Sequence, residues 1–142
     1  MKALKCAMTR EEIVPFMESV FPAIRGKFAL EDLAPMRARM RMKIGEREIR
    51  PGGTVSGPAM FELADVSFYV ATMGMIGPEA LTVTTNATIN FLNKPAACDL
   101  IGEARILKLG KLLSTGDVTI WSDGGDRPVA HATMTYAIPP KK

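Results

Sequence analysis

The segment from residue 58 to residue 76 constrains the fold most, because it has the pattern of a helix with almost no polar face. Ser56 is a suitable N-cap, Pro58 suits the first helical position, and Gly77-Pro78 supplies a stop. A helix that is apolar nearly all round is buried. It is long enough to span a bilayer, but its acidic residues and the strand patterns around it favour the core of a soluble protein.

Asp65 lies two turns into this helix, among Leu63, Ala64, Val66 and Phe68. An ionised carboxylate is expensive to desolvate, so its position calls for a reason. It is either a catalytic nucleophile or general base, or a structural carboxylate bonded to a neighbouring hydroxyl or amide. Glu62, three residues earlier on roughly the same face, is the rival acid.

Size and charge indicate one intracellular domain. The chain has 142 residues, a net charge of +3, two cysteines and no apolar stretch at its start that would make a signal peptide. That length suits a single core, and the cysteines make no disulfide framework. We therefore expect residues 1–142 to form one cytoplasmic domain with no membrane partner. The small positive charge permits a polyanionic partner without requiring one.

Residues 35–45 alternate Arg37, Arg39, Arg41 and Lys43 with apolar residues. This pattern predicts a half-buried strand with a charged outer face. Aromatic side chains do not interleave with these cations as a base-stacking platform requires, so we expect no nucleic-acid partner.

The remaining segments predict an α+β fold. Thr9 and Glu12 match a capping box for a short peripheral helix that contains Pro15, within an N-terminal segment of residues 1–34. After the central helix, four strands are expected at residues 81–92, 101–109, 112–121 and 129–138. Short connections make neighbouring strands antiparallel. Such a meander packs best by curling around the helix, which gives a core of residues 35–138.

Three motifs carry a resemblance to a known family: Leu63-Ala64-Asp65, the stretch from Thr88 to Pro95, and Gly102-Glu103-Ala104-Arg105 followed by Gly110-Lys111. With these motifs, roughly residues 35–138 resemble the hotdog fold, and in particular the PaaI-like acyl-CoA thioesterases. The family's His-Gly-Gly at the helix start is Ser56-Gly57-Pro58 here, so that motif has diverged.

The resemblance implies hydrolysis of an acyl-CoA thioester, with Asp65 attacking the thioester or activating water. It implies that the Gly57 N–H polarises the carbonyl and that Thr84 supports the reaction, although a register slip of one residue would exchange Thr84 for Thr85. Coenzyme A is then part of the substrate, and no cofactor is expected. The candidate substrate-binding residues, with Lys94 as a further cation, are Arg50, Ser56, Pro58, Asn86, Lys108 and Lys111.

Two other classes remain open. A non-catalytic hotdog protein that binds acyl-CoA as a sensor or scaffold is compatible with the diverged motif. A hotdog dehydratase fits poorly, because its members use a histidine and residues 50–65 contain none.

Spacing along the helix predicts a homodimer. Gly57 and Asp65 are eight residues apart, which is about 12 Å at ~1.5 Å per residue. One thioester carbon cannot reach both groups, so a site that uses both combines two chains. The resemblance implies the same, often with dimers paired into tetramers.

Metal and other nucleophilic chemistries are disfavoured by residue counts. His131 is the only histidine, so no histidine cluster can bind zinc and no metal is expected. Cys98 has no evident base beside it, Cys6 lies near the N-terminus, and the sequence lacks the nucleophile elbow of serine hydrolases.

Overall fold

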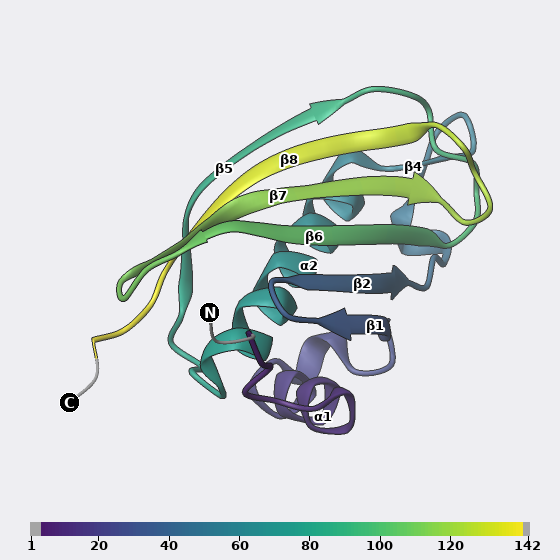
Figure 1. The fold of residues 1–142 in the computed structure, drawn as a ribbon. Coiled ribbons are helices and arrows are strands. Elements are labelled where there is room, and N and C mark those ends of the chain that lie inside the picture. The colour runs from purple at the N-terminus through teal and green to yellow at the C-terminus, as the bar shows by residue number, and fades with distance from the viewer. Residues whose placement is uncertain (1–3, 141–142) are drawn as a thin grey trace.

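A computed structural model describes residues 4–140. A curved antiparallel sheet wraps around one long helix, and a shorter helix lies at the edge of the structure (Figure 1). The helices are α1 (Arg10–Val20) and α2 (Gly57–Ile76), with short 3-10 turns η1 (Pro22–Ile24) and η2 (Glu46–Glu48). The strands are β1 (Phe28–Ala34), β2 (Arg37–Met42), β3 (Ile49–Arg50), β4 (Thr54–Val55), β5 (Val83–Phe91), β6 (Leu100–Leu109), β7 (Leu113–Ser122) and β8 (Pro128–Ala137).

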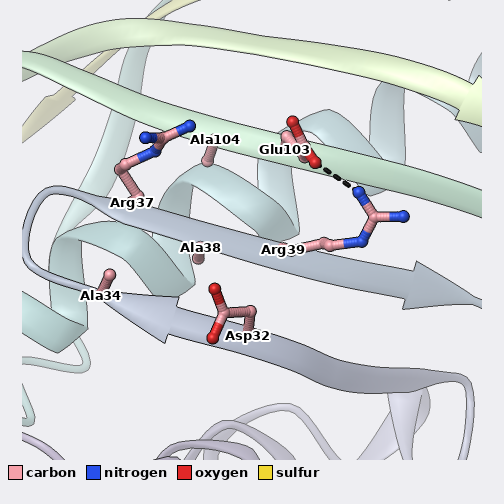
Figure 2. A pocket seen from close by; sticks show the side chains of 7 residues that line it. All are labelled: Asp32, Ala34, Arg37, Ala38, Arg39, Glu103 and Ala104. Carbon is pink, nitrogen blue, oxygen red and sulfur yellow. Dashed lines mark hydrogen bonds and ion pairs between the residues drawn. The ribbon is translucent and has the colours of Figure 1, made fainter.

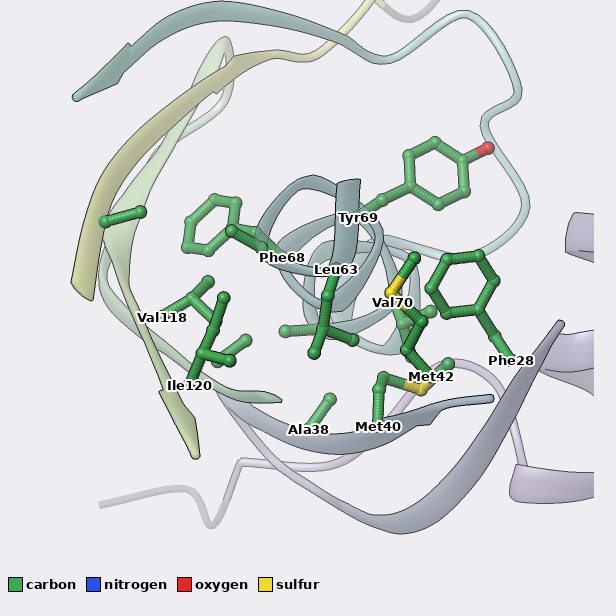
Figure 3. Close-up of a cluster of buried hydrophobic side chains, with 14 of the residues drawn as sticks. Phe28, Ala38, Met40, Met42, Leu63, Phe68, Tyr69, Val70, Val118 and Ile120 are labelled. Atoms are coloured by element: carbon green, nitrogen blue, oxygen red, sulfur yellow. The ribbon is translucent and has the colours of Figure 1, made fainter. Parts of the chain in front are cut away.

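Helix α2 is the predicted core helix. The Ser56 Oγ caps it by accepting the Ala59 N–H at 3.3 Å, and Gly77 ends it with a φ of 91°. Leu63 and Phe68 point from the helix toward the sheet (Figure 3). The helix is long and apolar enough to cross a membrane, but 67% of its most apolar window is buried inside the protein. The prediction of a buried core helix is confirmed.

Strand β2 confirms the alternating pattern. Ala38, Met40 and Met42 are buried against the helix, whereas the arginines between them lie on the outer face. There Arg39 bonds to Glu103, beside a shallow cavity of about 220 Å³ (Figure 2). Arg41 bonds to Asp123 at 2.7 Å. Arg39 and Arg41 are thus engaged with acids of β6 and of the β7–β8 turn, so the face has the character of a solvated ion-pair network.

The sheet order β1-β2-β6-β7-β8-β5 corrects two expectations. Strand β1 lies within the segment 1–34 that was expected to be peripheral, yet it pairs with β2 in the main sheet. The sequence of β1 does not alternate apolar with polar residues, and its burial does not alternate either. It therefore lacks the period of two that marks a half-buried strand. Strand β5 pairs with β8 and not with β6, because the connection 92–99 carries the chain to the other side of the sheet. The four strands after the helix are therefore not a simple meander.

Strand β5 forms one edge of the sheet, and its side chains are largely exposed. At the opposite side of the molecule, α1 has the predicted capping box of Thr9 and Glu12 and contains Pro15. The segment before it is fastened to α2, since the Ala7 N–H donates to the Gly74 carbonyl at 2.6 Å.

Candidate active site

Asp65 is half-buried and two hydroxyl groups hold its carboxylate. The Thr84 Oγ1 donates to Asp65 Oδ1 at 2.6 Å, and the Tyr136 Oη lies 2.5 Å from the same oxygen and 2.9 Å from the Asp65 carbonyl oxygen. No hydrogen bond from residues 4–140 reaches Oδ2. One carboxylate oxygen is therefore fixed and the other is available to react.

The structure also decides the register between the two threonines. Thr84 faces Asp65, whereas the Thr85 Oγ1 donates to the Thr135 carbonyl at 3.2 Å. The strand register shifts at a β-bulge between Thr84 and Asn86, where the side chains of Thr84 and Thr85 have different partners.

Tyr136 is a candidate site residue that the sequence analysis missed. It pairs directly with Thr84 across β5 and β8, so only a correct strand register could have revealed it. Burial, strengthened by the charge of Asp65, raises the pKa of Tyr136 far above its usual value. The hydroxyl therefore stays protonated and donates to Asp65.

A cavity of about 590 Å³ lies beside Asp65. Asp65, Glu62, Thr84 and Tyr136 share its lining with apolar residues of α1, η1 and α2. The Tyr69 and Thr82 hydroxyls also line it and have no hydrogen-bond partner among the described residues. Burial raises the pKa of Tyr69 to about 12, so this hydroxyl is a neutral donor available to an occupant.

Glu62, the rival acid, is occupied by a cation. The Lys27 Nζ lies 2.7 Å from Glu62 Oε1, and 3.9 Å from Glu48 Oε2. A neighbouring ammonium group makes a carboxylate a weaker nucleophile and base, whereas only neutral hydroxyl groups contact the carboxylate of Asp65. The geometry therefore favours Asp65 over Glu62.

The start of α2 offers one free N–H group. The Ser56 N–H donates to the Glu48 carbonyl at 2.7 Å, Pro58 has no N–H, and the Ala59 N–H is taken by the Ser56 Oγ. Within residues 4–140, this leaves only the Gly57 N–H without an acceptor among the donors of the first turn. That N–H is a ready oxyanion donor at the positive end of a helix.

A second cavity, of about 700 Å³, opens at Gly57. Arg50, Lys94, Pro58 and Phe91 are among its lining residues. The β3–β4 turn brings Arg50 here through glycines with φ of 101° and 79° at positions 52 and 53. The structure thus gathers Arg50, Gly57, Pro58 and Lys94, and Ser56 acts there as the helix cap.

The other candidate residues lie elsewhere. Asn86 is exposed on β5 and lines neither cavity. Lys108 and Lys111 lie at the β6–β7 turn, at the opposite end of the sheet from β4 (Figure 1). His131 bonds to Asp117 at 3.0 Å rather than to any candidate site residue. Residues 4–140 contain no cluster of three or more side chains that could hold a metal ion.

Gly57 and Asp65 lie on one unbroken helix and line different cavities. A single chain therefore does not bring the free N–H and the free carboxylate oxygen to one substrate carbon.

Comparison with known proteins assigns the family. Residues 52–129, which include Gly57 and Asp65, match the thioesterase superfamily. The chain belongs to this superfamily. A candidate thioesterase from Silicibacter sp. TM1040 is 47% identical in sequence, with a TM-score of 0.90 over 98% of this chain and 97% of that one. No curated protein matches this superfamily member.

Two further structures share its fold. A mutant of the phenylacetic acid degradation protein PaaI from Thermus thermophilus has 24% identity and a TM-score of 0.70, over 88% of this chain and 99% of that one. A Streptococcus mutans protein bound to acetyl-CoA has 19% identity and a TM-score of 0.72, over 83% and 93% of the two chains. The hotdog fold that the resemblance implied is thus confirmed, with PaaI among the structural neighbours.

Proposed function

We propose that this member of the thioesterase superfamily hydrolyses acyl-CoA thioesters, with Asp65 as nucleophile or general base. The observation that carries the proposal is the carboxylate of Asp65: Oδ1 is held by Thr84 and Tyr136, and Oδ2 is left free beside an apolar cavity. The acetyl-CoA bound to the Streptococcus mutans protein supports a CoA ester as the ligand of this fold.

The chemistry needs only protein groups and water, so no cofactor is proposed. Asp65 Oδ2 attacks the thioester carbon and expels the CoA thiolate, and water then hydrolyses the resulting anhydride; alternatively, Asp65 takes a proton from the attacking water. In either route the carbonyl oxygen gains negative charge, which the Gly57 N–H stabilises. The products are the free acid and the CoA thiol.

Strand β5 explains how one dimer can assemble this site. Thr84, near one end of β5, bonds to Asp65. Near the other end, the Phe91 ring lies so close to Gly57 that an added Cβ would be 3.3 Å from it. An antiparallel pairing of two β5 edges about Ala87 therefore places the Asp65 end of each chain beside the Gly57 end of its partner. We propose a homodimer with two such composite sites.

The cations at the helix start suit the phosphates of CoA. Arg50 and Lys94 line the cavity at Gly57, where the helix N-terminus adds to their positive potential. Lys108 and Lys111 lie at the end of the sheet where β5 begins, which the proposed pairing brings toward the Gly57 end of the partner. Substrate contacts from these lysines are thus proposed only for the dimer.

The test is release of free thiol from acetyl-, hexanoyl-, lauroyl-, benzoyl- and phenylacetyl-CoA. We expect the isosteric Asp65→Asn variant to lose about 10³-fold or more in kcat, while Glu62→Gln, at the rival acid, stays within about tenfold of wild type. The reverse order would transfer the role to Glu62. Tight acyl-CoA binding without turnover in the wild type would instead select a sensor or scaffold.

A further inference from the structure

The N-terminal segment contacts helix α2 on either side of Asp65 along the helix. Phe21 packs edge-on against Tyr69, one turn after Asp65, with ring centroids 5.6 Å apart. Lys27 pairs with Glu62, just under a turn before Asp65, at 2.7 Å. The stretch from residue 21 to residue 27 is therefore fastened to the helix on both sides of the reactive carboxylate.

Further contacts hold residues 21–27 in place. Ile13 and Met17 of α1 are buried in the protein core. The Gly26 N–H donates to Glu18 Oε2 at 2.8 Å, which closes the segment back onto α1. Pro22 begins η1 and restricts its backbone.

The N-terminal wall of the cavity consists of six apolar residues: Met17, Val20, Phe21, Pro22, Ala23 and Ile24. Asp65, Thr84 and Tyr136 supply hydrogen-bonding groups to the same cavity. An occupant that satisfies both sides has an apolar part along the N-terminal segment and a reactive carbon beside Asp65, as the acyl group of a thioester does. The volume of about 590 Å³ lies in the ordinary range of small-molecule sites and exceeds what an acetyl group needs.

We propose that the N-terminal segment is the specificity wall for the acyl group, and that the Phe21 ring limits the chain length the site accepts. This inference rests on the proposed function and names the substrate class as thioesters of medium-length apolar acyl groups. Phe21 is 43% exposed while Tyr69 beneath it is 5% exposed, so the ring lies at the mouth of the cavity. Shortening Phe21 lengthens the cavity and removes little from the core.

The experiment measures kcat/KM for a saturated series from acetyl- to palmitoyl-CoA. Phe21→Ala should raise the ratio of lauroyl to hexanoyl kcat/KM about tenfold over wild type, and Ala23→Phe should lower it by a similar factor. Phe16→Ala is the matched control, because Phe16 lies on α1 and does not line the cavity. Its ratio should equal that of the wild type.

A second readout separates this inference from the function itself. Affinities of non-hydrolysable S-alkyl-CoA thioethers, measured by calorimetry over the same chain lengths, should shift in the same directions. If all four proteins hydrolyse the series with the same order of preference for chain length, the proposed role of the N-terminal wall is wrong, and the thioesterase proposal still stands. An absence of turnover in the wild type would overturn the proposed function, and the thioether series alone would then support or refute the wall.

Discussion

Tyr136 and Thr84 share a single oxygen of Asp65, so each is a positioning residue for the carboxylate. Tyr136→Phe keeps the ring and removes one donor, which should lower kcat about 10- to 100-fold with little change in KM, because the interaction aims a reacting group. Steady-state kinetics on the best ester of the panel checks this. A wild-type kcat, or a loss confined to KM, would contradict the positioning role. The elevated pKa of Tyr136 predicts that the variant keeps the alkaline limb of the wild-type pH profile.

Asp117 permits a pH test away from the site. Burial raises its pKa, but hydrogen bonds from Arg105 and His131 outweigh that effect and hold it below the usual value. A depressed folded-state pKa stabilises the protein above the unfolded value of about 3.9, and that stabilisation is lost as the pH falls through the folded value. Asp117→Asn should therefore cost about 1 kcal/mol at pH 7 and much less near pH 3. Urea unfolding at both pH values measures the loss in free energy of unfolding, with the exposed Asp126→Asn as the control. A loss in Asp117→Asn that grows as the pH falls would refute the prediction.

Among the elements, helix α2 approaches the sheet closely where β6 carries Gly102. A Cβ at this position would lie 2.6 Å from the Ser67 Oγ and 3.0 Å from the Leu63 Cγ. Gly102→Ala should therefore lower the free energy of unfolding by about 1–3 kcal/mol. Because the Ser67 Oγ is buried without a partner among the described residues, Ser67→Ala should recover part of that loss in the double variant. Additive losses in chemical denaturation would show that the crowding lies elsewhere.

The elements also show what the sequence could predict. Helix α2, β2 and the last three strands were located well, because their caps, turns and periodicity are local signals. Asp65 and Gly57 were proposed as site residues from the helix and its motif, and that role stays a prediction. Strand β1, the edge position of β5, Tyr136 and the cavity-lining role of Phe21 depend on which distant segments pair, and no local pattern in one sequence specifies that.

At the scale of the whole molecule, the exposed β5 edge is long, uncharged and free of proline, which are the properties of an edge that pairs with another chain. Thr88 lies next to the proposed dyad at Ala87. Thr88→Lys and Thr88→Glu should each weaken self-association through like charges facing across the dyad, and an equimolar mixture should restore the dimer. Analytical ultracentrifugation of the separate and mixed proteins checks this. Monomers in the mixture would argue against β5 as the dimer interface. The test does not depend on whether dimers pack further into tetramers.

Complementation tests whether each site takes one residue from each chain. Asp65→Ala removes the acid, and Gly57→Pro removes the N–H at the first helical position. Because a Cβ at Gly57 would lie 3.3 Å from the Phe91 ring, circular dichroism first checks that this variant folds. Each variant alone should be inactive in thiol release. A mixed dimer joins the intact Asp65 of one chain to the intact Gly57 of the other, so unfolding and refolding the two together should recover about a quarter of wild-type activity, as random pairing into two-fold dimers requires. Two copies of one variant, refolded alone, give the baseline. No recovery from a mixture that contains folded heterodimers would mean that Gly57 and Asp65 do not serve the same substrate.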